Sequence, residues 1–445
     1  MDTKFPRVSG MRDILSSDHE YFTFIKKVVR YHARRSGLRR ISLPALLDFE
    51  LLKDALGEAS DLVSNSLYKM VNEEGVFALR PEYAASMARA YIEHNLHEKP
   101  QPVEFYYIDQ NWQRALPEHE AQGIFSEQHT FGFEILGEED PALDAQLIEM
   151  CAKIFSDLGL DVRLRMNNIG TKNAQDKYRE DLRNFFAGKE RNLGEDDVSK
   201  LEINPLHVLT SKNEDTQILV QIAPSIASSL DKEAKEHFTR VQEYLEVLGI
   251  EATVEEKLFG GLDYYRRVYF EFYIEQDDQE IVLGRGGRYD DLVADFGGPK
   301  TPALTFSADM DAMAAAMRRV QLAVPSKDKI SVFVVQLGDS AKKMALRLVS
   351  DLRARGIRTM GALGKASIRS QLESASKFEV EYALVLGQME VVEKKIIMRD
   401  MKKGTQETLP FAGVVERMVE LLDPSLLDTK DFRAMIEEAS DSDEE

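Results

Sequence analysis

Apolar side chains follow two different periods along the first part of the chain. Over residues 21–31 they recur every three or four positions, which predicts an amphipathic helix that ends at Gly37. Residues 38–44 then predict a short strand. Residues 105–108 and 129–136 alternate with a period of two, as strands with one buried face do. We therefore expect one antiparallel sheet, with the polar stretch between these two strands forming a hairpin loop.

A block rich in charged residues and helix formers occupies residues 171–240. A strand-like pattern resumes at residues 268–273. The block is therefore expected to be a helical insertion between two parts of the sheet. The first domain then spans residues 1–325 and is assembled from segments that lie far apart in the sequence.

A polar stretch after Val324 indicates a linker to a second domain. Beyond it, residues 330–335 predict a buried strand and residues 340–354 an amphipathic helix. Two later apolar runs repeat the alternation of strand and helix. We expect a small α/β domain over residues 330–423.

Composition limits the location and the partners of the chain. Its 445 residues, 43% of them hydrophobic, can bury more than one core. Cys151 is the only cysteine, so an intramolecular disulfide and a cysteine zinc site are excluded and a cytoplasmic location is expected. No apolar run is long enough to span a bilayer. The net charge of -20 disfavours a broad nucleic-acid surface, and the acidic residues 424–445 are expected to be a disordered tail.

Several short motifs appear in a distinctive order along the chain. They are Gly10-Met11-Arg12-Asp13, Phe77-Ala78-Leu79-Arg80-Pro81-Glu82, Gly260-Gly261-Leu262-Asp263-Tyr264-Tyr265, Gly286-Gly287-Arg288-Tyr289-Asp290 and, in the second domain, Lys365-Ala366-Ser367 and Gly387 with Glu390. The series resembles the histidyl-tRNA synthetases, a family of class II aminoacyl-tRNA synthetases. The resemblance implies an α+β antiparallel sheet core of the class II type with a helical insertion, followed by a small α/β anticodon-binding-like domain. It also implies a homodimer.

Three positions depart from the family in chemically important ways. The resemblance places arginines that contact ATP or the amino-acid carboxylate at Gln113, Gly260 and Ala312. Histidine activation joins two anions, so the loss of these cations is expected to slow it severely. The loop with Glu118 and Glu120 adds negative charge where the family is basic.

Neighbouring arginines offer three possible replacements for the missing charge. Arg114 follows Gln113 directly, but adjacent side chains of a strand point to opposite faces. Arg266 and Arg267 stand close to Gly260 in the sequence. One of these two is expected to fill the phosphate pocket and the other to face solvent.

The part of the family site that holds the amino acid is better preserved. The resemblance assigns this pocket to Glu82, Ala84, Thr130, Glu134, Tyr264 and Tyr265. Ala84 stands where the family has a threonine and Thr130 where it has a glutamine, which weakens the expected contact with histidine. Core packing is an equally good interpretation of the two tyrosines.

Three functions remain compatible with the sequence. The preferred one is a catalytically impaired paralogue, a pseudoenzyme with a binding or regulatory role. It is expected to bind histidine or a related small molecule, and to bind tRNA weakly. The alternative is an active histidine–tRNA ligase with displaced arginines, which would require ATP and magnesium. The third is an enzyme of different chemistry in the altered pocket. No pattern of metal ligands is evident, and no cofactor is expected outside the ligase alternative.

Overall fold

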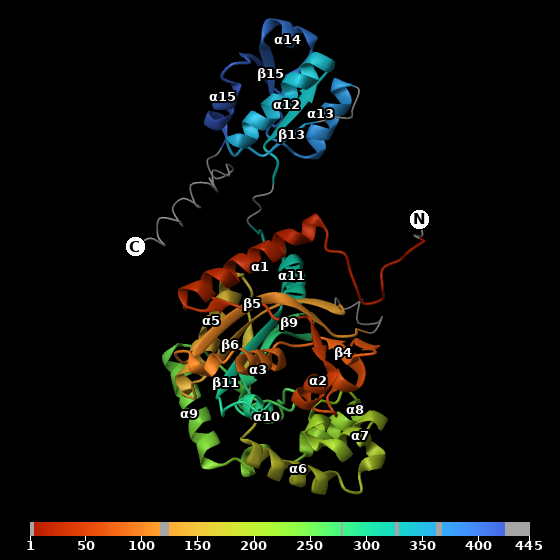
Figure 1. The fold of residues 1–445 in the computed structure, drawn as a ribbon, viewed down its shortest axis with the longest axis vertical. Helices are drawn as coiled ribbons and strands as arrows, with labels where there is room; N and C mark the ends of the chain where they lie inside the picture. The colour runs from red at the N-terminus through yellow and green to blue at the C-terminus, as the bar shows by residue number, and fades with distance from the viewer. Residues whose placement is uncertain (1–3, 116–123, 277–278, 325–328, 362–366, 423–445) are drawn as a thin grey trace. The chain divides into compact units, whose positions relative to one another are not determined.

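The computed structural model describes residues 4–115, 124–276, 279–324, 329–361 and 367–422. The chain divides into two compact units, Met1–Val324 and Pro325–Glu445 (Figure 1). The acidic residues 424–445, the loop with Glu118 and Glu120, and Lys365-Ala366 lie outside the described residues. The expectations for these three segments therefore stay predictions.

A helix opens the first unit, as the periodicity predicts. Helix α1 (Ser16–Arg35) buries Phe22, Ile25, Val29 and Ala33, whose spacing of three and four residues keeps them on one side. Gly37 follows it with a φ of +83°, a conformation that glycine adopts without steric cost. The strand expected over residues 38–44 is reduced to β1 (Arg39–Arg40), which pairs in parallel with β5 (Val103–Trp112).

An eight-stranded sheet forms the centre of this unit, in the order β1-β5-β6-β11-β10-β9-β7-β8. Its further strands are β5 (Val103–Trp112), β6 (Glu127–Leu136), β7 (Arg163–Asn168), β8 (Thr253–Val254), β9 (Arg266–Gln276), β10 (Gln279–Arg288) and β11 (Ala303–Asp309). Strands β5 and β6 pair antiparallel over their full lengths. The expected hairpin loop is therefore too long, because polar residues at its two ends belong to the strands.

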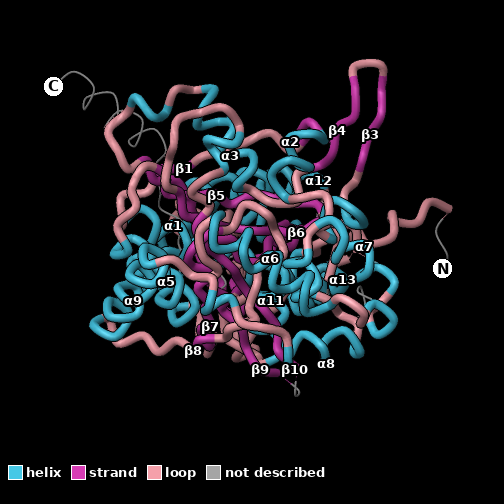
Figure 2. The backbone as a smooth tube through the Cα atoms, turned by 90° about the horizontal axis from the view of Figure 1, so that it is seen from below, coloured by secondary structure: helices cyan, strands magenta, loops and turns pink. Residues whose placement is uncertain are grey.

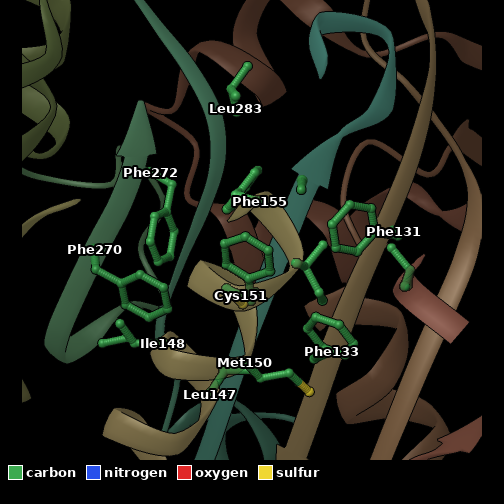
Figure 3. Packing of buried hydrophobic residues seen from close by; sticks show 14 of the residues in the cluster. Phe131, Phe133, Leu147, Ile148, Met150, Cys151, Phe155, Phe270, Phe272 and Leu283 are labelled. Carbon is green, nitrogen blue, oxygen red and sulfur yellow. The ribbon is translucent and has the colours of Figure 1, made fainter. Parts of the chain in front are cut away.

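One face of the large sheet is apolar and covered by helices. Helices α1, α5 (Pro141–Asp157), α9 (Lys232–Val247) and α11 (Met310–Arg319) share a hydrophobic cluster with it. Figure 3 shows Phe131 and Phe133 of β6 and Phe270 and Phe272 of β9 around Phe155 and Cys151 of α5. Burial of these aromatic side chains supplies much of the apolar area removed from water in this unit.

Smaller elements form the rest of the first unit. A three-stranded sheet runs in the order β2-β4-β3, with β2 (Leu46–Asp48), β3 (Lys69–Asn72) and β4 (Gly75–Leu79). Figure 2 shows the β3–β4 ladder projecting from its neighbours. Helices α2 (Phe49–Leu56), α3 (Ala84–Glu93) and α10 (Leu292–Asp295) complete this part.

The central block contains helices and no strand between β7 and β8. These are α6 (Lys172–Phe186), α7 (Glu195–Ile203) and α8 (Glu214–Ile222), three short 3₁₀ segments, and α9. Tyr178, Leu182 and Phe186 of α6 share a second hydrophobic cluster with α2 and α3. The helical insertion expected from the sequence is thus present, although α9 packs with the core helix α5.

The second unit is a small α/β domain. Its sheet runs in the order β13-β12-β14-β15-β16, with β12 (Val332–Gln336), β13 (Thr359–Gly361), β14 (Tyr382–Leu386), β15 (Lys395–Asp400) and β16 (Gln406–Pro410). Its helices are α12 (Asp339–Ala354), α13 (Ile368–Lys377), α14 (Gln388–Glu393) and α15 (Val414–Leu421). The predicted fold class, an α+β sheet core with a helical insertion followed by an α/β domain, is confirmed. Among the described residues no helix is long and apolar enough to cross a membrane.

Candidate functional site

The face of the large sheet opposite the helices is polar. Side chains alternate along a strand, so the residues directly before and after each buried phenylalanine point to the opposite face. On the central strands β5, β6, β11, β10 and β9 these opposite positions are Asp109, Asn111, Thr130, Glu134, Thr305, Ser307, Asp309, Arg285, Tyr269 and Glu271. The candidate site lies on this polar face.

Glu134 is fully buried on this face and held by two hydroxyl groups. Tyr289 Oη and Thr305 Oγ1 each donate a hydrogen bond of 2.7 Å to its carboxyl oxygens. Burial raises the pKa of Glu134 to about 8. The carboxyl group is therefore mostly protonated near neutral pH. A basic ligand that entered the site would ionise it and gain a charge-assisted hydrogen bond.

Glu82 is buried nearby and caps a helix. Its two carboxyl oxygens accept hydrogen bonds from the backbone N–H groups of Ala84 (2.7 Å) and Ala85 (3.0 Å) at the start of α3. Tyr264 Oη donates a third bond of 3.2 Å. Burial raises the pKa of Glu82, although the three hydrogen bonds oppose this effect. Part of the carboxylate is thus already used by the protein itself.

Two tyrosines connect Glu82 to Glu134. The ring of Tyr264 lies 6.0 Å from that of Tyr289, which donates to Glu134. Tyr265 packs against Tyr264 with ring centroids 4.6 Å apart. Both Tyr264 and Tyr265 are buried in the second hydrophobic cluster, so packing and hydrogen bonding coexist here.

Thr130 and Ala84 border the same region. Thr130 Oγ1 accepts a hydrogen bond of 3.3 Å from Asn111 Nδ2, and Ala84 is buried at the first turn of α3. The fold therefore brings all six residues of the expected amino-acid pocket to one part of the first unit. What they bind stays a prediction.

The three positions without the family arginines have structural roles. Gln113 Nε2 donates to the carbonyl oxygen of Pro81 (2.9 Å) and so ties the end of β5 to the segment before Glu82. The N–H of Ala312 donates to Asp309, which caps α11. A Cβ atom at Gly260 would lie 2.6 Å from ring atoms of Tyr265 and Tyr269. The backbone at Gly260 is thus packed against rings that leave no room for a side chain.

Replacing Gly260 by alanine is therefore expected to destabilise the first unit by about 1–3 kcal/mol, because the added methyl group overpacks the two rings. Backbone strain does not contribute, since the φ of Gly260 lies outside the left-handed region. Thermal unfolding of Gly260→Ala measures the effect. In the control Gly361→Ala the new Cβ meets nothing nearer than 3.4 Å. Equal unfolding temperatures for wild type and Gly260→Ala would contradict this packing.

The neighbouring arginines do not replace the missing charge. Arg266 is buried and donates to Asp291 Oδ2 (2.7 Å) and to the carbonyl oxygens of Asp263 and Tyr265. Arg267 pairs with Glu233 and with Asp290. The expectation that one of the two fills a phosphate pocket is wrong, because both guanidinium groups already bind protein oxygens. The backbone N–H of Arg114 donates to the carbonyl oxygen of Ser66, but its side chain is exposed and its guanidinium group has no hydrogen bond or ion pair with the described residues.

Two further arginines reach this part of the sheet, Arg12 of the first motif and Arg285, which lies outside the motifs. Arg12 forms an ion pair with Asp311 at the start of α11 and lies 4.2 Å from the ring of Phe125. Arg285 stands on the polar face of β10. The sequence signal for Arg285 is a charged residue between two glycines, directly after the apolar residues 281–283.

Cavities and metal-binding groups add little to this site. Two cavities of about 450 and 410 Å³ open beside α2; Asp54 lines both, and neither includes Glu134. Across the part of the chain that the structure describes, no cluster of three or more His, Cys, Asp or Glu side chains could hold a metal ion. The polar face of the sheet remains the candidate site.

Comparison with known proteins agrees with the fold and with the motifs. The family model described as histidyl-tRNA synthetase matches residues 10–313, and the anticodon binding domain model matches residues 331–421. A histidine–tRNA ligase of Desulfitobacterium hafniense is 34% identical over 412 residues, which cover 92% of this chain and 96% of that protein. One of Dehalococcoides mccartyi is 32% identical over 408 residues, covering 91% and 97%.

Among solved structures, the chain is similar to the apo histidyl-tRNA synthetase of S. aureus, with a TM-score of 0.77 and 26% identity. The match covers 94% of this chain and 100% of that one. The two family models, the relatives and the solved structure thus agree over nearly the whole length, and the chain belongs to the histidyl-tRNA synthetase family.

Proposed function

We propose that this chain is a histidine–tRNA ligase. The observation that carries the proposal is the pair of buried carboxyl groups, Glu134 and Glu82, joined through Tyr289 and Tyr264. A buried acid with a pKa of about 8 suits a ligand that brings its own basic group, as an imidazole does. The name and the long match of the relatives support the same activity.

The proposed roles follow from the position of each side chain. Glu134 would accept a hydrogen bond from the imidazole, while Tyr289 and Thr305 fix its orientation. Glu82, together with Tyr264, would face the amino group. A carboxylate oxygen of histidine would then attack the α-phosphorus of ATP, and pyrophosphate would leave. In a second step a ribose hydroxyl of tRNA would attack the acyl carbon, and AMP would leave.

Magnesium would accompany ATP in this reaction. It binds mainly phosphate oxygens with one or two carboxylates, and it neutralises phosphate charge. Glu271 and Asp309 are carboxylates on the polar face of the sheet. They suit such a supporting contact, although they do not form a complete protein site for the ion.

A second candidate is the catalytically impaired paralogue. It is favoured by Gln113, Gly260 and Ala312, none of which carries a positive charge. In that case the pocket of Glu134 and Glu82 would still bind histidine. The two candidates differ in chemistry and share the ligand.

Histidine-dependent exchange of pyrophosphate with ATP separates the two candidates. We expect exchange that requires histidine and that falls at least tenfold in Glu134→Gln, because the substrate loses its buried partner. Reactions without histidine give the background. Binding of histidine with no exchange above that background would reject the ligase and leave the impaired paralogue.

The same proposal includes partners and location. A match of residues 331–421 to the anticodon binding domain supports binding of tRNA, and the net charge of -20 predicts that this binding is weak and sensitive to salt.

The family membership supports a homodimer, which sedimentation measures directly. A cytoplasmic location is part of this proposal, because the substrates of a tRNA ligase are found there.

A further inference from the structure

Arg285 owes its orientation to an irregularity in β10. Strand β10 has a register shift between Val282 and Gly284 where it pairs with β9. Ile281 lies before this shift and Leu283 lies within it, and both pack with the apolar cluster on the helix-covered face. Simple alternation would send Arg285 to that same apolar side. A β-bulge at this point reverses the alternation, so Arg285 pairs with Glu271 and Ser307 on the polar face.

The side chain of Arg285 is exposed in the middle of a central strand. Gly284 and Gly286 on either side of it are buried, and β10 has β9 and β11 as neighbours. Solvent therefore reaches the sheet face at Arg285 itself. Among the described residues its guanidinium group has no hydrogen bond and no ion pair within 4.0 Å. An arginine in the centre of a sheet is rarely left without a partner.

Arg288, three residues later on the same strand, shows the contrast. Its guanidinium is fully buried and binds Asp144 at 2.7 Å and two backbone carbonyl oxygens. Arg288 therefore has a structural role that Arg285 lacks. The two arginines of β10 differ because one is saturated by protein oxygens and the other is available to a ligand.

The surroundings keep Arg285 charged. Although the side chain reaches solvent, the protein atoms around its guanidinium group would by themselves lower its pKa, but Tyr269, Glu271, Tyr265 and Asp309 more than offset this and raise it. A Cβ atom at Gly260 would meet the rings of Tyr265 and Tyr269, and one at Gly287 would meet the ring of Tyr265. Arg285 thus stands near tyrosine rings and glycines that bring no positive charge of their own.

We propose that Arg285 binds the anionic group of the ligand on the polar sheet face, a carboxylate or a phosphate. The inference rests on the proposed function for the identity of the ligands, histidine and ATP. A guanidinium fork binds either anion with two parallel hydrogen bonds. Arg285 would supply from β10 the positive charge that the chain lacks at Gly260, which the tyrosine rings prevent from carrying a side chain.

Calorimetric titration of the full-length chain tests this role without requiring turnover. The probes are ATP, histidine, and histidinol, which has the same ring and amine but no carboxylate. In Arg285→Met we expect at least a tenfold loss of affinity for ATP if the phosphate is the anion, or for histidine if the carboxylate is. Affinity for histidinol should change less than twofold. Arg285→Lys should recover part of the loss, because it restores charge without the fork.

Arg163→Met is the matched control, since Arg163 is an exposed arginine on an outer strand of the same sheet. It should bind all three probes as the wild type does. Unfolding temperatures of both methionine variants should stay within a few degrees of the wild type, because neither arginine is buried. A destabilised Arg285→Met would show that the residue is structural and would overturn the proposal.

The outcomes separate this inference from the ligase activity. Unchanged affinity of Arg285→Met for both ATP and histidine overturns the role of Arg285, as does a wild type that binds neither probe. A tenfold loss of ATP affinity in a chain without pyrophosphate exchange supports the role of Arg285 and rejects the ligase. Full exchange in Arg285→Met keeps the ligase and rejects the role of Arg285.

Discussion

Replacing Asp144 by alanine is expected to destabilise the first unit by about 3–5 kcal/mol. Asp144 and Arg288 are both fully buried, and Arg288 Nε and Nη2 donate to the carboxylate of Asp144 at 2.7–3.0 Å. Removal of Asp144 leaves a buried guanidinium whose remaining carboxylate contact is Asp290 at 3.4 Å. The pair also joins β10 to the start of α5, so its loss loosens the attachment of a core helix.

Denaturant unfolding of the first unit measures this loss. The exposed pair Lys232–Glu236 on α9 provides the control, and Glu236→Ala should cost less than about 0.5 kcal/mol. Two transitions are expected from two units, and only that of the first should move. A loss below about 1 kcal/mol in Asp144→Ala would mean that the buried pair contributes far less than its geometry indicates.

The pH dependence of this effect has a definite sign. Burial alone would raise the pKa of Asp144, but Arg288 and His237 outweigh it and lower the pKa below its ordinary value of 3.8. A carboxylate with a lowered folded-state pKa stabilises the fold above its unfolded pKa and loses this effect as pH falls. The difference in stability between the wild type and Asp144→Ala should therefore be constant near neutral pH and shrink below about pH 4.

Replacing Glu134 by glutamine is expected to weaken histidine binding about a hundredfold. A hydrogen bond between an ionised carboxylate and a basic ring contributes about 2–3 kcal/mol in a buried site, and the neutral amide cannot form it. Calorimetric titration with histidine measures the loss. Glu104→Gln is the control. Glu104 is a partly buried acid on β5, and its side chain lies on the side of the sheet opposite to Glu134. Equal affinity in wild type and Glu134→Gln would remove Glu134 from the pocket.

Stability of the same variant gives an independent measurement. Burial raises the folded-state pKa of Glu134 from 4.5 to about 8. Between these values the unfolded chain binds fewer protons than the folded one, so ionisation of Glu134 makes the wild type less stable as pH rises. Glu134→Gln lacks this group. Its stability relative to the wild type should therefore increase from about pH 4.5 to about pH 8 and level off above that.

Local patterns predicted most of the fold. The spacing of Phe22, Ile25 and Val29 is enough to place α1, because a helix buries one side whatever it packs against. The alternation in β5 and β6 predicted their antiparallel pairing. The ends of these strands were missed, since Asn111 and Gln128 are polar residues that point to a polar sheet face and look like a loop in the sequence.

The candidate site was predicted unevenly. Glu82, Glu134, Tyr264 and Tyr265 were found through motifs, and the structure brings them together. Arg266 and Arg267 were misjudged. Their closeness to Gly260 in the sequence does not show which carboxylates the fold brings next to their guanidinium groups. Asp291 and Asp290 bind these two guanidinium groups, and they come from a segment more than twenty residues away.

The sequence by itself determined the family, the helical insertion, the second domain and the loss of charge at Gln113, Gly260 and Ala312. These are properties of residue identity and of repeats no longer than about one helical turn. Tertiary structure alone decided which arginine faces the site. One extra residue in β10 reverses the alternation after Leu283, and only pairing with β9 reveals it. The direction of Arg285 is thus set by the register of neighbouring strands, a long-range property that no local pattern contains.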